Sequence, residues 1–395
     1  GCGKGAPPDG ANPDGGAGDG DGVGDGDGDG DGDGDGDGDG DGDGDGDGDG
    51  DGDGDGDGDG DGDGDGDGDG DGSAFDFQAE GDCADVAEGQ LPNALSCAGL
   101  FTDIEAKEIS PEAREFKPAY LLWSDGADKT RWVILPEGEQ IDNSDPDSWR
   151  MPVGTKLFKE FRWKGHRVET RLYWKSGEGR WLKTSYHWNE DETEATRFAG
   201  GEVDVAGDTY YIPEAKECDQ CHKGRTDRSL GFEKILLSLP GAEGLNLEKL
   251  VEEDLLTDPP DADSYEIGDD GTGLAPEALG YLHVNCGVSC HNGNPASEGY
   301  ASDLRLRLPP DAIDGRSPED FETLTTTIGV DAQTPRWSDG TRIVPGSPED
   351  SLLYQLISMR DPDNPKDQMP PIGSAIVDED GIDIVADWIR ALPAD

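Results

Sequence analysis

The sequence predicts an α+β chain of several parts: a disordered acidic N-terminal stalk, an antiparallel β-rich domain and an all-α C-terminal domain. Three observations lead to this order. Residues 25–72 are an uninterrupted Asp-Gly repeat. Seven of the nine Trp fall between Trp123 and Trp188, in segments with the two-residue period of strands. Apolar residues at helical spacing occur near the C-terminus, in 276–285 and 378–392.

Residues 1–72 contain very few apolar side chains, so burial cannot offset the entropy lost when a backbone is ordered. We therefore expect 1–72 to be a disordered, Asp-Gly-rich tether. A stalk is its favoured role, because a Gly-rich chain of like charges is extended. Calcium binding by the carboxylates is the alternative, although the repeat lacks the hydrophobic position by which nonapeptide calcium repeats stack.

The first residues and the net charge indicate location and partners. Gly1-Cys2 is similar to the end of a bacterial lipobox, which predicts a lipid anchor at Cys2, with a free thiol as the alternative. The formal net charge of −61 argues against a nucleic-acid binder, since a polyanion would be repelled. The sequence has no run of 18 apolar residues to span a bilayer. Basic partner proteins or a saline habitat would each account for the acidity.

The β-rich domain is expected over 73–265. Four segments rich in β-branched and aromatic residues predict its strands: Thr130–Leu135, Lys156–Trp163, Arg167–Trp174 and Arg180–Trp188. Short turns at 164–166 and 176–179 separate three of these segments, so we expect an antiparallel meander. A further hairpin is expected over 203–212 and leads the chain to Cys218.

Four of the seven Cys lie in two short motifs that end in His. Residues 218–222 read C-D-Q-C-H, the C-x-x-C-H signature of c-type haem attachment, and residues 286–291 read C-G-V-S-C-H, with one more residue between the thiols. Paired thiols attach to the vinyl groups of one porphyrin, and the His that follows ligates the iron. We therefore expect two covalently attached haem c groups, held by Cys218, Cys221 and His222 and by Cys286, Cys290 and His291.

Three other interpretations of these Cys are weaker. One zinc site built from all four thiols would leave the two His unexplained. A thioredoxin-like redox pair would need a βαβ setting, which the sequence does not show. Disulfides between the close thiols of each motif would be strained loops.

Met369 is the expected sixth iron ligand of the second haem. It precedes two Pro residues, and in small c-type cytochromes a Met on a Pro-rich loop late in the domain binds the iron face opposite the His. Met359, at the end of a predicted helix, is the rival, and plain packing is the alternative role.

The helical pattern around this Met is typical of small c-type cytochromes, which cross their first and last helices beside the haem. Ser347 and Pro348 indicate a further helix start, with Ser as the cap and Pro in the first turn. We therefore expect residues 266–395 to form a cytochrome c domain that carries the second haem.

Cys83 and Cys97 fit a disulfide in an oxidising compartment, with two buried thiols as the alternative. The sixth ligand of the first haem is left unassigned by the sequence. Its candidates are His166, His187, His283 and Met151. Strand alternation puts His187 on the more polar face of its strand, which favours a surface role.

Segments in both halves of the chain resemble a known family. These segments are 120–126 (YLLWSDG), 151–156 (MPVGTK), 169–171 (ETR), 186–189 (YHWN), Ile212-Pro213, Ser347-Pro348 and 369–371 (MPP). They resemble the large dihaem c-type cytochromes of planctomycetes, myxobacteria and marine proteobacteria. The resemblance implies a β-rich haem domain, a C-terminal cytochrome c domain and electron transfer. Residues 152–156 and Lys159 are also similar to a strand of cytochrome c-prime-beta, a likeness at the level of fold.

The function expected from these features is electron transfer by two haems in the cell envelope, in the periplasm or at the outer-membrane surface. Redox proteins with basic docking surfaces are the expected partners. The alternative is a haem enzyme of peroxidase-like or other small-molecule chemistry, in which the first haem has an open coordination position and the second feeds it. A third interpretation makes the Trp-rich sheet a glycan- or protein-binding module.

Overall fold

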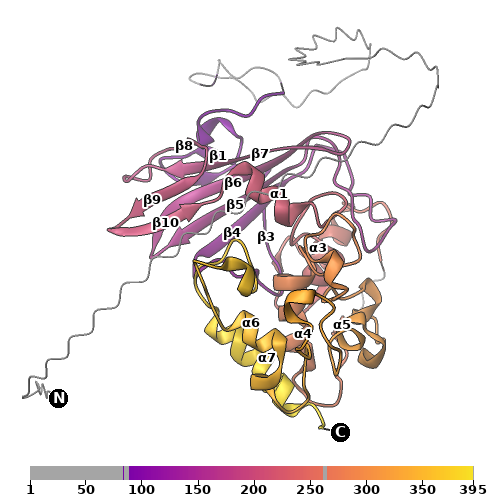
Figure 1. The fold of residues 1–395 in the computed structure, drawn as a ribbon. Coiled ribbons are helices and arrows are strands. Elements are labelled where there is room, and N and C mark those ends of the chain that lie inside the picture. The colour runs from indigo at the N-terminus through magenta and orange to yellow at the C-terminus, as the bar shows by residue number, and fades with distance from the viewer. Residues whose placement is uncertain (1–82, 84–88, 261–264, 395) are drawn as a thin grey trace, which may run out of the picture. The chain divides into compact units, whose positions relative to one another are not determined.

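The computed structural model describes residues 83, 89–260 and 265–394 (Figure 1). The predicted tether over 1–72 and the predicted lipid anchor at Cys2 lie outside these residues.

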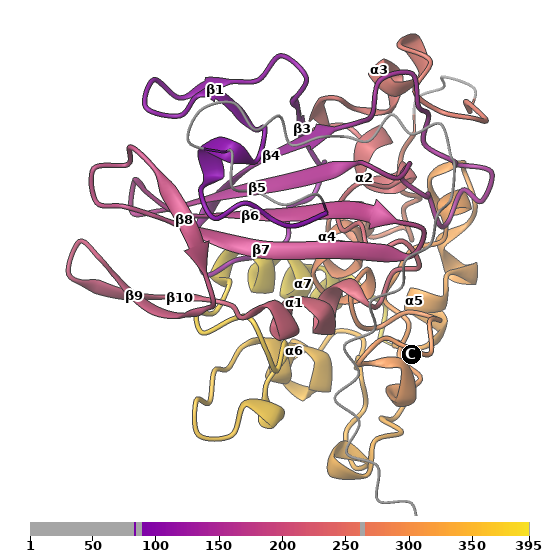
Figure 2. The same cartoon turned by 90° about the horizontal axis from the view of Figure 1, so that it is seen from above.

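A seven-stranded antiparallel sheet dominates the first half of the described chain (Figure 2). Its strands lie in the order β11-β3-β4-β5-β6-β7-β8, so the six strands from β3 to β8 follow one another as a meander. Their bounds are β3 Arg114–Lys117, β4 Asp128–Ile134, β5 Lys156–Trp163, β6 His166–Gly177, β7 Arg180–Trp188, β8 Ala195–Phe198 and β11 Glu243–Gly244. The predicted antiparallel β-rich part is therefore confirmed.

Two small hairpin-like pairs flank the sheet. They are β1 Phe101–Asp103 with β2 Glu108–Ile109, and β9 Gly201–Val205 with β10 Asp208–Ile212. The second pair confirms the hairpin predicted over 203–212. Its turn residues Ala206 and Gly207 both have positive φ, as a two-residue type I′ turn requires.

The turn between β5 and β6 is shorter than predicted. Lys164 and Gly165 both have positive φ, at 51° and 87°, and His166 already pairs with Trp163. A two-residue turn of this type matches the twist of the flanking strands, which is why the third expected turn residue belongs to β6.

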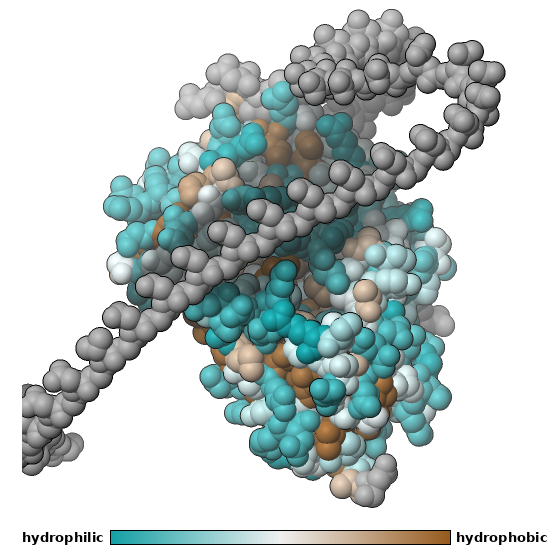
Figure 3. Space-filling model, in the orientation of Figure 1, coloured by the Kyte–Doolittle hydropathy of each residue, from teal (hydrophilic) through white to brown (hydrophobic). Residues whose placement is uncertain are grey.

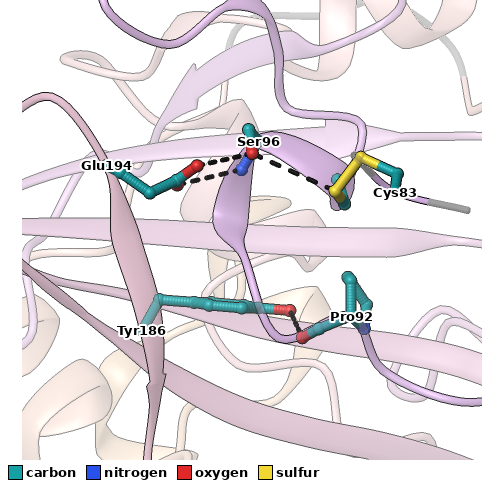
Figure 4. Close-up of a disulfide and its surroundings, with 6 residues drawn as sticks. Cys83, Pro92, Ser96, Tyr186 and Glu194 are labelled. Carbon is teal, nitrogen blue, oxygen red and sulfur yellow. Dashed lines mark hydrogen bonds between the residues drawn. A yellow bond between two sulfur atoms is a disulfide. The ribbon is translucent and has the colours of Figure 1, made fainter. Parts of the chain in front are cut away.

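The two faces of the sheet pack against different layers. One face carries Trp132, Phe158 and Leu172 and is covered by the segment that holds Leu95 and Leu100. A disulfide links Cys97 of this covering segment to Cys83, with 5.6 Å between the Cα atoms (Figure 4).

Two hydrogen-bonded contacts tie the covering segment to the sheet. Both the backbone N–H and the hydroxyl of Ser96 donate to the Glu194 carboxylate, and the Tyr186 hydroxyl donates to the Pro92 carbonyl, as Figure 4 shows.

The opposite face of the sheet packs on helices that follow it in the chain. Val133, Leu157 and Trp181 share a core with residues of two short helices, Leu237 of α2 (Lys234–Ser238) and Leu250 of α3 (Leu247–Glu252). Thus the face of β7 that carries His187 is not a solvent face: Trp181 and Ser185 on it are buried. The alternation of residues along β7 was predicted correctly. The polar residues on its His187 face, however, do not mean that this face is open to solvent.

Helices and loops make up the remainder of the described chain. The helices are α1 Ala215–His222, α2 Lys234–Ser238, α3 Leu247–Glu252, α4 Ala275–Leu282, α5 Glu322–Thr325, α6 Leu352–Ile357 and α7 Glu379–Ala391. The apolar residues of α4 to α7 form one core, and Ile235 of α2 and Leu239 directly after α2 belong to the same core. The core therefore continues across position 265.

Two helix predictions need correction. The helix expected over 276–285 is α4 followed by a π-helical turn over His283–Gly287. Ser347 makes no side-chain cap, because Pro348–Asp350 is a 3₁₀ turn and α6 begins at Leu352. The helix expected over 378–392 is confirmed as α7, and the Asp378 carboxylate accepts a hydrogen bond from the N–H of Gly381 at 3.1 Å.

Hydrophilic residues dominate the face of the molecule seen in Figure 3, with small separate hydrophobic areas. Within the described residues, none of the helices combines the length and the apolar character needed to cross a bilayer.

Candidate functional site

The first Cys motif lies on α1, directly after the β9–β10 hairpin. Helix α1 begins where the carboxylate of Glu217 accepts a hydrogen bond from the backbone N–H of Glu214 at 2.7 Å. Cys218 and Cys221 are three residues apart in this helix and therefore lie on one face of it. The two thiols are presented together by local helix geometry.

His222 is held with one ring nitrogen engaged. Its Nδ1 lies 2.6 Å from the Arg228 carbonyl oxygen, so Nδ1 carries the proton and Nε2 keeps its lone pair. The ring stacks on Tyr173 of β6, with 4.0 Å between the centroids and 13° between the planes. Burial lowers the pKa of His222 well below its usual value, so the imidazole is neutral, which is the form that ligates a metal.

A cavity of about 630 Å³ opens beside this motif. Its wall includes Cys218, Cys221 and His222, part of the sheet face formed by β4–β6, the segment 284–289 and the loop 371–376. Cavities of ~300–1,000 Å³ hold cofactors and drug-sized ligands. The cavity therefore has the size expected of a cofactor site. It contacts the second motif only through Val288 and Ser289, and Cys286, Cys290 and His291 are not part of its wall.

The second motif follows the π-helical turn. The N–H of His291 donates to the carbonyl of Cys286, five residues back, at 2.8 Å, and the N–H of Cys290 donates to the same carbonyl at 3.2 Å. Such a wide turn absorbs one extra residue in a helix. The additional residue between the two thiols is accommodated in this way, and Cys286 and Cys290 lie four residues apart on one helical face.

His291 resembles His222 in its surroundings. Its Nδ1 lies 3.2 Å from the Ser302 hydroxyl oxygen, which again leaves Nε2 without that contact. Burial lowers the pKa of His291 to about 4, so its ring is neutral near pH 7.

The structure brings the two motifs into direct contact. A Cβ atom at Gly224 would overlap the carbonyl oxygen of Ser289, so only Gly fits there. The Asn294 side chain donates to the carbonyls of Lys223 and Gly224 at 3.4 and 3.3 Å, and Lys223 pairs with Glu298 at 2.7 Å. The two predicted attachment segments, far apart in the sequence, therefore lie against each other.

All four motif thiols are free and neutral at pH 7. Burial raises the pKa of each, to about 12 for Cys286 and for Cys290, where the neighbouring Cys221 adds to the effect. Within the described part of the chain, no three His, Cys, Asp or Glu side chains are arranged to hold one metal ion. The four thiols thus do not meet in the geometry of a single zinc site.

Met369 is half-buried and packs against the same core as Cys286, while 42% of Met359 is exposed. The loop after Met369 is fixed by Asp125, whose carboxylate accepts hydrogen bonds from the Ser374 hydroxyl and from the N–H groups of Ala375 and Ile376, at 2.9–3.0 Å. Met369 therefore shares a core with the second motif, and Met359 is not part of that core.

None of the four candidates for the sixth ligand of the first haem lines the cavity. The His166 side chain is 54% exposed, and Nδ1 of His187 lies 3.0 Å from the Val168 carbonyl oxygen. Both ring nitrogens of His283 are engaged, with Glu233 and with the N–H of Leu308. Met151 is buried in the core between the sheet and α3.

No protein-family model, curated protein or solved structure matches the chain. The site must therefore be interpreted from its own geometry.

The residues present fit a haem c at the first motif. Two thiols and a neutral His from one helix face a cavity of suitable size, and the His presents an unprotonated Nε2. At the second motif Cys286 lies in the π-helical turn, and Cys290 and His291 lie directly after it. Of this stretch, Val284, Val288 and Ser289 line the cavity.

Three features of the site were missed from the sequence. They are the Tyr173 ring under His222, the Arg228 carbonyl on its Nδ1, and a row of cations formed by Arg131, Lys159 and Arg171 on adjacent strands. The alternation of β4, β5 and β6 places each cation on the cavity face, but only the register between the strands shows that they are neighbours.

Proposed function

We propose that the chain is a dihaem c-type cytochrome that transfers electrons in the bacterial cell envelope, as a member of the dihaem family that its segments resemble. The observation that carries the proposal is the contact between two His-terminated Cys motifs beside one cofactor-sized cavity. Two attachment segments held against each other would keep two redox centres close, which is the requirement for passing electrons between them.

The roles of the residues follow from their chemistry. Covalent haem would supply a one-electron centre at each motif. Cys218, Cys221 and His222 would hold the first group. Cys286, Cys290 and His291 would hold the second, with Met369 as the soft sixth ligand that favours the reduced state. The segment from 266 onward would then be the cytochrome c domain of the molecule.

The surroundings of these residues would position and insulate the groups. The Arg228 carbonyl fixes the ring orientation of His222 and makes Nε2 a better donor. The half-buried, neutral thiols are not attacking thiolates, so they stay available for thioether formation during maturation.

A haem enzyme is the second candidate, and one observation favours it. Among the described residues that line the cavity, His222 is the sole histidine and there is no methionine. This favours a first haem whose distal side accepts a small molecule. The two candidates differ in one spectroscopic respect: the enzyme requires a high-spin first haem that responds to carbon monoxide, and the carrier does not.

Expression of the chain in a host with working cytochrome maturation tests the proposal. We expect coloured protein whose mass exceeds that of the polypeptide by two haem groups. Cys221→Ser and Cys290→Ser should each leave at most one thioether bond at its site and lower the haem content below two per chain. His187→Ala is the matched control, because this histidine lies outside the cavity wall, and it should keep both haems.

Colourless protein of bare polypeptide mass would overturn the proposal. Equal haem loss in Cys221→Ser, Cys290→Ser and the control would also contradict it, since the attachment would then not depend on the two motifs.

A further inference from the structure

A row of three cations crosses the sheet on its cavity side. Arg131 of β4 lies directly opposite Lys159 of β5, which lies directly opposite Arg171 of β6. All three side chains line the cavity. Lys129, two residues before Arg131 on β4, lines it as well. Like charges directly opposite each other in neighbouring strands are destabilising, so this arrangement needs a compensating anion.

The chain itself supplies little compensation. Arg171 pairs with Glu169, through hydrogen bonds of 2.6 and 2.9 Å. Arg131 is only 4% exposed, and the hydrogen bond described for it goes to the backbone carbonyl of Lys129 at 3.4 Å. Among the described residues, the Lys159 ammonium makes no ion pair or hydrogen bond. The Glu169 carboxylate is therefore the one partner of opposite charge for a row of three cations within the described residues.

The electrostatic cost of the row lowers the pKa of two of its cations. Burial, with Arg131 and Arg171 nearby, lowers the pKa of Lys159 to about 7, and burial lowers the pKa of Arg131 to about 10. The row occurs in a chain with 92 acidic and 31 basic residues. Cations that are rare in the sequence are thus concentrated at one hollow, where their charge is costly without a partner.

Three acids line the cavity wall, Asp125, Glu202 and Glu217, and two of them are held by hydrogen bonds elsewhere. Asp125 accepts three hydrogen bonds from the loop 374–376, and Glu217 accepts from Tyr211 and from the start of α1. Of the acids near the row, only Glu169 makes an ion pair with one of its cations. An anion bound in the cavity would supply the charge that this single pair leaves uncompensated.

We propose that Arg131, Lys159 and Arg171 form a binding site for a small oxyanion or carboxylate in the cavity beside the first Cys motif. Guanidinium groups are suited to such ligands because their N–H donors match the oxygens of a planar or tetrahedral anion in pairs. The anion has two sources: a soluble oxyanion, or the propionate carboxylates of the haem attached at this motif. The second source rests on the proposed function, and the first does not.

Calorimetric titration of the full chain with sodium acetate and sodium sulfate tests the soluble source, with sodium chloride at equal ionic strength as the reference. Lys159→Met and Arg131→Met remove one cation each. Lys183→Met is the matched control, because Lys183 shares the sheet face but pairs with Asp219 at 2.5 Å and does not line the cavity. Lys159→Arg keeps the charge and guards against an effect of misfolding.

A soluble anion predicts saturable binding that weakens by about tenfold or more in Lys159→Met and Arg131→Met, because each loses a hydrogen bond to a charged group. The control and Lys159→Arg should keep most of the affinity. A bound propionate instead predicts no titration and a lower midpoint potential of the first haem in both Met variants, since a lost cation favours the oxidised iron, with a smaller change in Lys183→Met.

The inference is overturned if the wild type neither binds the anions nor differs in potential from Lys159→Met and Arg131→Met by more than the control does. Colourless protein that still binds acetate or sulfate would separate the two conclusions: the proposed function would fail and the anion site would stand.

Discussion

At the scale of single residues, the two histidines that end the Cys motifs are held alike. Each is half-buried and neutral, and each has its Nδ1 against an oxygen atom, the Arg228 carbonyl for His222 and the Ser302 hydroxyl for His291. Such contacts fix the orientation of an imidazole ligand and keep Nε2 for the metal. Two sites with different Cys spacing thus present their His with the same chemistry.

Met369 gives a prediction at this scale. The Met369→Ala variant should lose the weak near-infrared sulfur-to-iron band and the low-spin His/Met signal of the second haem, because the thioether ligand is gone. Met359→Ala is the control and should keep both, since Met359 is an exposed residue outside the core that Met369 joins. An unchanged band in Met369→Ala would rule out this ligand. The measurements are absorption and electron paramagnetic resonance of the oxidised protein.

At the scale of elements, a buried polar network joins the helical part to the sheet side. Glu233 at the start of α2 contacts His283 at 2.7 Å and Arg307 at 3.1 Å, and Arg225 at 3.3 Å. Arg307 also pairs with Asp147 from the loop after β4. Burial alone would raise the pKa of Glu233, but the two Arg lower it well below its usual value.

The tautomer of His283 is fixed by this network. The N–H of Leu308 donates to its Nδ1 at 3.0 Å, so Nδ1 bears no proton and Nε2–H donates to Glu233. Protonation would place a second N–H against the Leu308 donor. Burial, opposed only in part by Glu233, accordingly lowers the pKa of His283 below 6.5.

This network predicts acid lability. A base whose pKa is lower in the folded state makes the unfolded state the stronger proton acceptor, so the free energy of unfolding should fall as pH drops below about 6.5, by up to ~1.4 kcal/mol per pH unit from this group. His283→Asn should reduce that slope, and His166→Asn, at an exposed site, is the control. Denaturant unfolding at pH 7, 6 and 5 measures it. Equal slopes in the wild type and His283→Asn would contradict the assignment.

At the scale of the whole molecule, the net charge is opposite in sign to the cation row that lines the cavity. The chain carries a net charge of −61, while cations gather at the cavity wall. An acidic exterior steers basic partners toward the surface, and the effect weakens as salt screens it.

The expected consequence is a salt-dependent rate. Electron exchange with a small basic redox protein should slow by about tenfold or more between low and physiological ionic strength, because the steering field is screened. An acidic partner of similar size serves as the comparison and should speed up over the same range. Stopped-flow spectroscopy measures both rates. A rate with the basic partner that is insensitive to salt would contradict an acidic docking surface.

Much of the β-rich part could be predicted, because strand periodicity and turn residues are local properties. The bounds of β5 and β7 match the expected segments, and α7 begins after the expected Asp378 cap. The π-helical turn was not predicted, since the chain around Cys286 has the apolar pattern of an ordinary helix. The wide turn is a conformation of the folded backbone, and the apolar pattern does not distinguish it from an α-helical turn.

The cation row shows why register escapes a sequence-based prediction. From the two-residue turn at Lys164 and Gly165, simple counting would pair Lys159 with Thr170. A bulge next to Arg162 shifts the register by one residue, so Lys159 pairs with Arg171. A shift of one residue exchanges the two faces of a strand, and the row exists only because of it.

The sequence by itself determined the elements and the chemistry of each motif: strands from their period, paired thiols and a His from their spacing within one or two helical turns. Those features depend on neighbours in the chain. The tertiary structure decided what lies opposite what: Gly224 against Ser289, three cations in one row, and an Asp125 carboxylate on a loop from the far end of the chain. Such contacts depend on how distant segments pack, and no local pattern encodes them.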